Sequence, residues 1–127
     1  MNFEKVVFGF FVLFAATLNL GFFVGDLTDP TQHNPFQLFA AIVVSLIATI
    51  LKFGDRTQLG AVHLATSLVA DVELIIAGTV WTWGSQLTSA GLTPSVLATA
   101  VSIAGGALLA NLVSVVLLVT ETVTLRR

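Results

Sequence analysis

Residues 60–83 read GAVHLATSLVADVELIIAGTVWTW, a stretch that is apolar enough to cross a membrane and yet contains three ionisable residues. These are His63, Asp71 and Glu73, whereas the other apolar stretches have no ionisable side chain in their interiors. An acidic side chain within the hydrocarbon layer is costly to insert and usually serves a function. This stretch therefore decides both the expected fold and the expected site.

The composition of the whole chain indicates a membrane protein surrounded by a lipid bilayer. Of its 127 residues, 56% are hydrophobic and 9% are charged, whereas about 25% of the residues of a typical soluble domain are charged. The net charge of −2 provides no basic surface, so no nucleic-acid partner is expected. The absence of cysteine excludes disulfides, thiolate metal sites and cysteine nucleophiles.

Four apolar stretches have the length of a transmembrane helix, which is about 20 residues. We expect them at residues 6–24, 35–52, 59–83 and 95–120 of a single transmembrane domain. The expected fold is therefore an all-α integral membrane protein, a bundle of four transmembrane helices. A secretory signal is the alternative for the first stretch, but that stretch exceeds the usual signal core of about 7–15 residues and lacks a clean cleavage site.

Several residues mark the ends of the expected helices. Asn34 and Thr93 each precede a proline, which predicts a capping side chain followed by proline at the first helical position. Trp81 and Trp83 end the third stretch, where an aromatic belt at the membrane surface is expected. His33, in the loop before the second helix, is expected to be solvated.

The basic residues predict the orientation. In a layout of four spans, all five lie on the same side of the membrane: Lys5, Lys52, Arg56, Arg126 and Arg127. By the positive-inside rule, both termini and the middle turn are expected in the cytoplasm. From this pattern and the small size of the chain, we expect a multi-pass protein of a bacterial-type inner (plasma) membrane.

Helix geometry separates the ionisable residues of the third span. At about 100° per residue, Asp71 and Glu73 point roughly 160° apart. Asp71 shares its side of the helix with Ser67 and, more loosely, with His63. Because one neighbouring surface cannot cover both acids, we expect a homo-oligomer or a larger membrane complex, with one acid in the bundle and the other at a subunit interface.

The buried acids are the candidate ion or proton site. We expect Asp71 to be the principal proton or cation site and Glu73 the second, with Ser67 and His63 on the polar side. The competing interpretation is a neutral acid that serves only as a hydrogen-bonded packing residue. Since the three ionisable residues point in different directions, we expect no metal site, no cofactor and no catalytic triad, and hence no enzyme.

Other polar and small residues are expected at helix contacts. Asn19 and Asn111 lie within the first and fourth spans, where asparagine usually forms hydrogen bonds between helices; either is a possible partner of a buried acid. Small residues four positions apart allow close approach of helices and predict a packing face on the fourth span. They are Ala98, Ser102, Gly106, Ala110 and Ser114.

Two classes of function fit these features. In the first, the protein is an oligomeric proton- or cation-conducting unit, or an ion-coupled transport unit, that uses the buried acids of the third span. In the second, it is a non-catalytic accessory or assembly subunit of a larger membrane transport or respiratory complex, and its acids bind a partner.

Overall fold

The computed structural model describes residues 3–26, 29–53 and 58–125, which form four long helices joined by short loops. The helices are α1 (Phe3–Phe23), α2 (Pro35–Lys52), α3 (Gln58–Thr82) and α4 (Pro94–Leu125), and the described residues include no strand. Each helix is long and apolar enough to cross a membrane. The expected all-helical fold with four candidate membrane spans is therefore confirmed.

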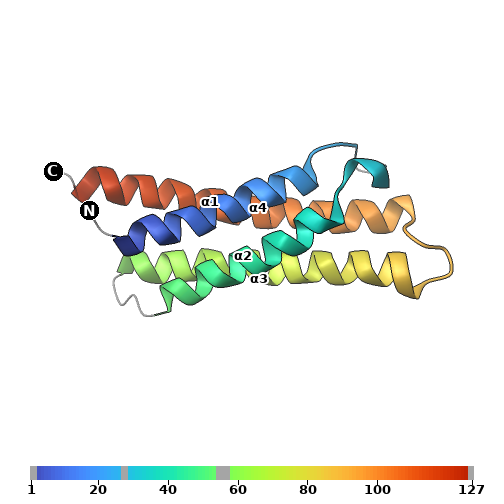
Figure 1. Ribbon diagram of the computed structural model, residues 1–127, viewed down its shortest axis with the longest axis horizontal. Helices are drawn as coiled ribbons and strands as arrows, with labels where there is room; N and C mark the ends of the chain where they lie inside the picture. The colour runs from blue at the N-terminus through green and yellow to red at the C-terminus, as the bar shows by residue number, and fades with distance from the viewer. Residues whose placement is uncertain (1–2, 27–28, 54–57, 126–127) are drawn as a thin grey trace.

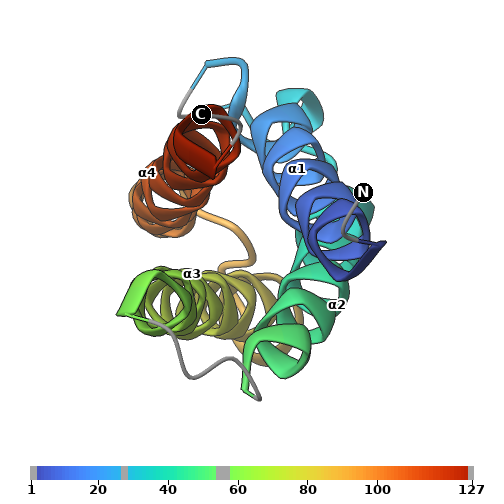
Figure 2. The same ribbon diagram turned by 90° about the vertical axis from the view of Figure 1, so that its left-hand side faces the viewer.

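The helices form a ring in which each one runs antiparallel to the next (Figure 1). Helix α1 packs against α2 and α4, and α3 packs against the same two helices. Figure 2 shows this ring along the bundle, with both chain ends on the same side of the molecule. We call this side the terminal end; it also holds the end of α2 and the start of α3, and the opposite side is the loop end.

The expected helix caps are confirmed. The Asn34 side chain accepts a hydrogen bond of 2.9 Å from the Phe36 amide, and the Thr93 hydroxyl accepts one of 3.2 Å from the Val96 amide. These bonds satisfy amide groups that have no partner within the first turn of a helix. After α1, Gly25 has a φ of 122°, a conformation that glycine adopts without strain and that turns the chain into the first loop.

The prediction of a solvated His33 is wrong, because the residue is only 1% exposed. Its Nδ1 atom lies 2.7 Å from the Phe22 carbonyl oxygen, and its Nε2 atom lies 2.6 Å from the Asp26 carbonyl oxygen. The last carbonyl groups of a helix have no intrahelical partner, and the imidazole ring supplies one for α1. His33 therefore fastens the first loop to the end of α1.

Asp29 organises the rest of this loop. Its carboxylate accepts hydrogen bonds from the Thr31 hydroxyl, the Thr31 amide and the Gln32 side chain. These hydrogen bonds, first that of the Thr31 hydroxyl, hold the pKa of Asp29 below its usual value. The loop end therefore carries a carboxylate that stays ionised until the pH falls through this lowered pKa.

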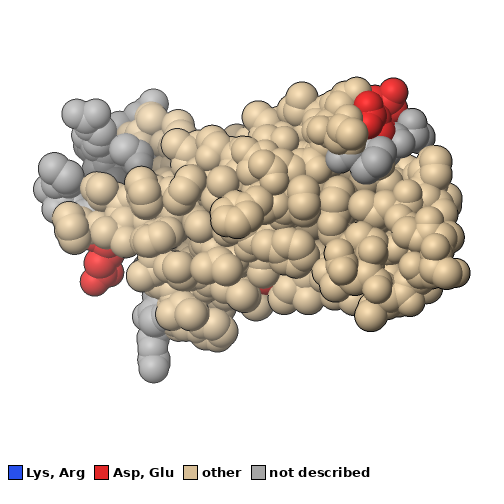
Figure 3. Space-filling model, turned by 45° about the vertical axis from the view of Figure 1, so that its right-hand side comes forward, with Lys and Arg blue, Asp and Glu red and all other residues tan. Residues whose placement is uncertain are grey.

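The outside of the bundle is apolar along its length. Figure 3 shows a face that is nearly free of charged side chains between its two ends. Large apolar side chains are exposed on every helix, for example Phe10, Ile50, Val72 and Val116. Four candidate membrane spans together with an apolar surface of this extent are typical of a membrane protein.

The helix ends differ from the predicted spans at three places. Helix α1 begins earlier, at Phe3, and α4 continues to Leu125; α3 is extended by a π-helical turn at Trp83–Leu87. Of the basic residues used for the orientation, Lys5 and Lys52 both lie at the terminal end. The others, Arg56, Arg126 and Arg127, lie outside the described residues.

Candidate functional site

Asp71 is held by two hydroxyl groups of α2. Its side chain is only 5% exposed, near the middle of α3. The Ser45 hydroxyl donates a hydrogen bond of 2.7 Å to Asp71 Oδ1, and the Thr49 hydroxyl donates one to Oδ2. Each oxygen of the carboxylate therefore has a donor from the neighbouring helix.

Helical spacing explains why these donors converge. Ser45 and Thr49 are four residues apart, so they lie one turn from each other on the same face of α2. Both are buried on that face. A pair of hydroxyl residues four positions apart in an apolar helix is therefore the sequence pattern that could have indicated the partner of Asp71. Asn19 and Asn111, which we considered for this role, do not bind Asp71.

The Thr49 hydroxyl has a second acceptor within reach, because its oxygen also lies 3.1 Å from the Ser45 carbonyl oxygen. When Asp71 is ionised, this hydroxyl donates to the carboxylate. When Asp71 is protonated, its O–H group donates to Thr49 Oγ1, and the Thr49 proton turns to the Ser45 carbonyl. The site therefore provides hydrogen bonds for both protonation states without moving a helix.

Buried polar side chains continue from Asp71 towards the terminal end. Ser67 and His63 precede it by four and eight residues on the same side of α3, and both are buried. At 1.5 Å per residue, this row is about 12 Å long. On the other side of α3, the Thr66 hydroxyl contacts the hydroxyl of Ser114 in α4. The interior of this half of the bundle therefore holds buried polar groups along α3, beside a small apolar cluster of Phe8, Val12 and Ala48.

Charged and aromatic side chains from all four helices meet at the terminal end. Lys5 of α1 forms an ion pair with Glu121 of α4, and His63 Nε2 lies 3.8 Å from Glu121 Oε2. The centroid of the Phe8 ring lies 5.1 Å from that of His63 and 4.4 Å from the Lys52 ammonium. We call these five residues the terminal cluster. Of these five residues, the sequence pattern indicates only His63 as a site residue, because the paired residues lie as far as 116 positions apart.

The interior of the loop half is apolar. Its main polar contact is a hydrogen bond of 2.9 Å from the Asn19 side chain to the Ala104 carbonyl oxygen, which joins α1 to α4. The large buried side chains of this half are Phe22, Leu38, Leu74, Trp81 and Leu97. Polar groups therefore lead to Asp71 from the terminal end, and apolar side chains fill the bundle beyond it.

Glu73 faces α4. Its carboxyl group lies against Gly106, where an added Cβ atom would collide with Glu73 Oε2. Because α3 lies between α2 and α4, one helix of the same chain covers Asp71 and another covers Glu73. Each acid therefore has a neighbouring helix within one chain, so the two acids alone do not require an oligomer, and the oligomer stays a prediction.

Gly106→Ala is expected to change the free energy of unfolding of the native chain by less than about 1 kcal/mol. The added Cβ atom displaces the end of the flexible Glu73 side chain, which costs about 1 kcal/mol, and the higher helix propensity of alanine offsets about 1 kcal/mol. In a Glu73→Ala background nothing is displaced, so the same substitution is expected to stabilise the bundle by about 1 kcal/mol. The unfolding midpoints of the four proteins in SDS-containing mixed micelles test this difference; an equal effect of Gly106→Ala in both backgrounds would contradict it.

The small residues of α4 do not form one buried face. Residues four apart advance by about 400°, so a ladder at this spacing drifts by about 40° at each step. Its members differ accordingly: Ser114 is buried, Ala98, Gly106 and Ala110 are half-buried, and Ser102 is exposed. Within the single chain, Ser102 therefore lies outside the helix contacts, and its part in a packing face stays a prediction. The buried face consists of Leu97, Ala100, Val101, Ala104, Ala107, Asn111 and Ser114.

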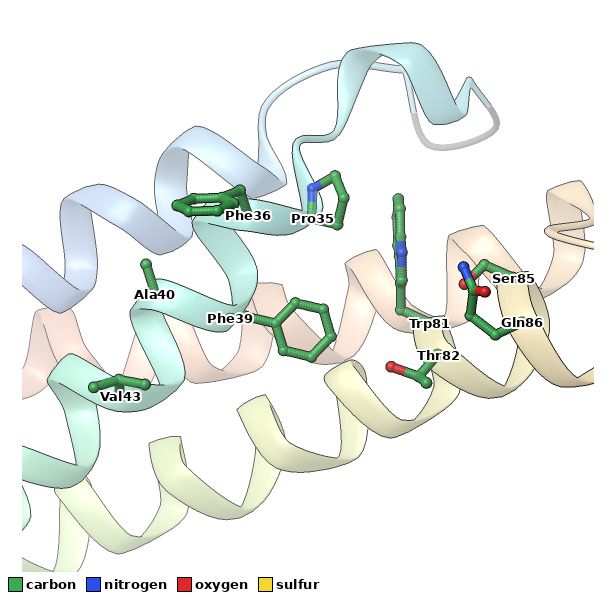
Figure 4. Close-up of a pocket in the computed structure, with 9 residues that line it drawn as sticks. All are labelled: Pro35, Phe36, Phe39, Ala40, Val43, Trp81, Thr82, Ser85 and Gln86. Carbon is green, nitrogen blue, oxygen red and sulfur yellow. The ribbon is translucent and has the colours of Figure 1, made fainter.

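An apolar groove of about 610 Å³ lies between the start of α2 and the end of α3. In Figure 4, Phe39 and Trp81 project into it from the two helices, and Ser85 and Gln86 lie on its loop side. A second groove of about 450 Å³ shares Phe39 with the first. No ionisable residue lines either groove, so both are separate from the Asp71 site.

A family model matches most of the chain. It describes a family of unknown function, DUF6394, and matches residues 32–122. The match includes Asp71, its two hydroxyl partners, His63 and Glu121, whereas α1 lies outside it. No curated protein and no solved structure matches the chain.

Proposed function

This chain belongs to DUF6394, a family of unknown function, and we propose that it is an ion-coupled membrane protein whose Asp71 takes up and releases a proton. The observation that carries the proposal is the pair of α2 hydroxyls on the carboxyl group, together with the second acceptor of Thr49. An acid that only packs needs hydrogen bonds for one protonation state. An acid that exchanges a proton needs them for both, and this site has them.

The proton reaches Asp71 from the terminal end. The buried polar row of Ser67 and His63 leads from there, whereas the interior beyond Asp71 is filled by apolar side chains. The positive-inside rule assigns this end, which carries Lys5 and Lys52, to the cytoplasm. The inner (plasma) membrane is the membrane that we propose. One chain supplies the whole site, so the proposal does not require an oligomer.

Infrared difference spectroscopy in lipid nanodiscs tests this function. As the pH is lowered, the carbonyl band of a protonated buried carboxyl is expected to appear, because Asp71 binds a proton. Asp71→Asn is expected to remove the band, whereas Glu73→Gln, the matched change on the α4 side, is expected to retain it. Thr49→Val is expected to shift its frequency, because the O–H group of the acid loses its acceptor. A band that persists in Asp71→Asn contradicts the proposal.

An accessory subunit is the second candidate function, and the apolar loop half favours it. Because the polar interior reaches Asp71 from one end only in this structure, an ion can cross the membrane either after a rearrangement of the apolar half or along a polar path that a partner supplies. Native mass spectrometry of gently extracted membranes separates the two candidates. A stable complex of defined mass with a larger transport or respiratory protein supports the accessory role. A protein that runs as a single chain and takes up protons in liposomes without a partner contradicts it.

A further inference from the structure

Glu121 lies at the boundary between water and the buried interior. Its side chain is 15% exposed at the terminal end. One carboxylate oxygen, Oε1, pairs with the Lys5 ammonium, and the other, Oε2, lies 3.8 Å from His63 Nε2. The same carboxylate is therefore accessible to water and adjacent to a fully buried imidazole.

His63 connects this boundary to the candidate site. Its side chain is completely buried, and its ring packs edge-on against Phe8, which fixes the orientation of the ring. Ser67 and Asp71 follow on the same side of α3 at intervals of one turn. A proton that arrives at His63 is therefore at the start of the buried polar row.

The remaining charges of the terminal cluster come from α1 and α2. Lys5 holds Glu121 Oε1, which leaves Oε2 directed towards His63. The Lys52 ammonium lies over the ring of Phe8, which contacts His63 by its edge. One cation therefore contacts Glu121 directly, and the other lies on the aromatic ring that packs against His63.

We propose that Glu121 and His63 form the proton entry of the Asp71 site. This inference rests on the proposed function of Asp71. A proton from water forms an O–H bond at Glu121 Oε2. The flexible Glu121 side chain closes the 3.8 Å to His63 Nε2, and the O–H bond breaks as an N–H bond forms there. The imidazolium then loses the proton of its other nitrogen, and that proton passes along the side of α3 that carries Ser67 and forms the O–H bond of Asp71, which restores the neutral ring. Imidazole suits this step, because it exchanges protons on both nitrogens near neutral pH.

The rate at which Asp71 is protonated after a pH jump tests the entry, and the carbonyl band of Asp71 in nanodiscs reports it. Glu121→Gln is expected to slow the appearance of the band by about 10-fold to 100-fold and to leave its final amplitude unchanged, since the variant removes a proton-transfer group but not the binding site. Glu121→Asp is expected to restore part of the rate. Glu73→Gln is the matched control, because it makes the same change at a carboxyl group that faces Gly106 of α4, outside the terminal cluster, and it is expected to keep the native rate.

His63→Gln is expected to slow the appearance of the Asp71 band as much as Glu121→Gln does. In the double variant the band is expected to appear no more slowly than in either single variant, since both residues serve one path. A native rate in Glu121→Gln overturns the inference, and so does an equal slowing in Glu73→Gln. If Glu121→Gln fails to fold, a native rate in His63→Gln overturns it. Complete absence of the Asp71 band in the native protein would instead refute the proposed function.

Discussion

Proteoliposomes that contain Asp71→Asn are expected to lose proton uptake by about 100-fold or more relative to the native protein, because the amide can neither bind nor release the proton. Asparagine has nearly the shape of aspartate. Its carbonyl oxygen can accept the hydrogen bond from Ser45, and its amide can donate to Thr49, so the helices are expected to stay in place. The measurement is the fluorescence of a pH-sensitive dye inside the vesicles while a membrane potential is imposed.

Glu73→Gln is the matched control for this experiment. The residue lies two positions from Asp71 on the same helix, but it faces Gly106 of α4, away from the polar row. It is expected to retain most of the native flux. Unchanged flux in the double variant Asp71→Asn, Glu73→Gln would remove both acids from the mechanism, and an inactive native protein would favour the accessory role.

Trp81→Ala is expected to lower the free energy of unfolding by about 3–5 kcal/mol, because it removes a large buried aromatic ring. Trp81 is 7% exposed, and its ring packs edge-to-face on that of Phe22 with 5.5 Å between centroids. Phe22 in turn provides the carbonyl group that binds His33. Loss of Trp81 therefore loosens both the apolar half of the core and the first loop.

Trp83→Ala is the matched control, since the same side chain is removed two residues further on. Trp83 is 52% exposed, and its loss is expected to change the free energy of unfolding by less than about 1 kcal/mol. SDS titration of both variants in mixed micelles compares the two. Equal destabilisation would contradict the structure, which places only Trp81 inside the bundle.

The two tryptophans show how far a local pattern can be interpreted. The sequence predicts an aromatic belt for both, because they end an apolar span. Residues two positions apart on a helix point about 160° away from each other, so only one of the two tryptophans can face outwards. Which one does so depends on where Phe22 and the α1–α2 loop pack, and those contacts come from distant parts of the chain.

The same division holds at the candidate site. The sequence predicts that Asp71 lies near the middle of a span and shares a side with Ser67 and His63, since both properties follow from residue spacing along one helix. It does not predict that Ser45 and Thr49 would bind the acid. That contact depends on the rotation and depth of α2 relative to α3.

The sequence by itself determined four apolar helices, their caps and a pair of acids in the third helix, because hydropathy, helix length and capping are local properties. Only the tertiary structure decided that α2 covers Asp71, that α4 covers Glu73, and that Lys5 meets Glu121 beside His63. These contacts join residues separated by 22 to 116 positions. They depend on how the side chains of whole helices pack together, which no single stretch of sequence specifies.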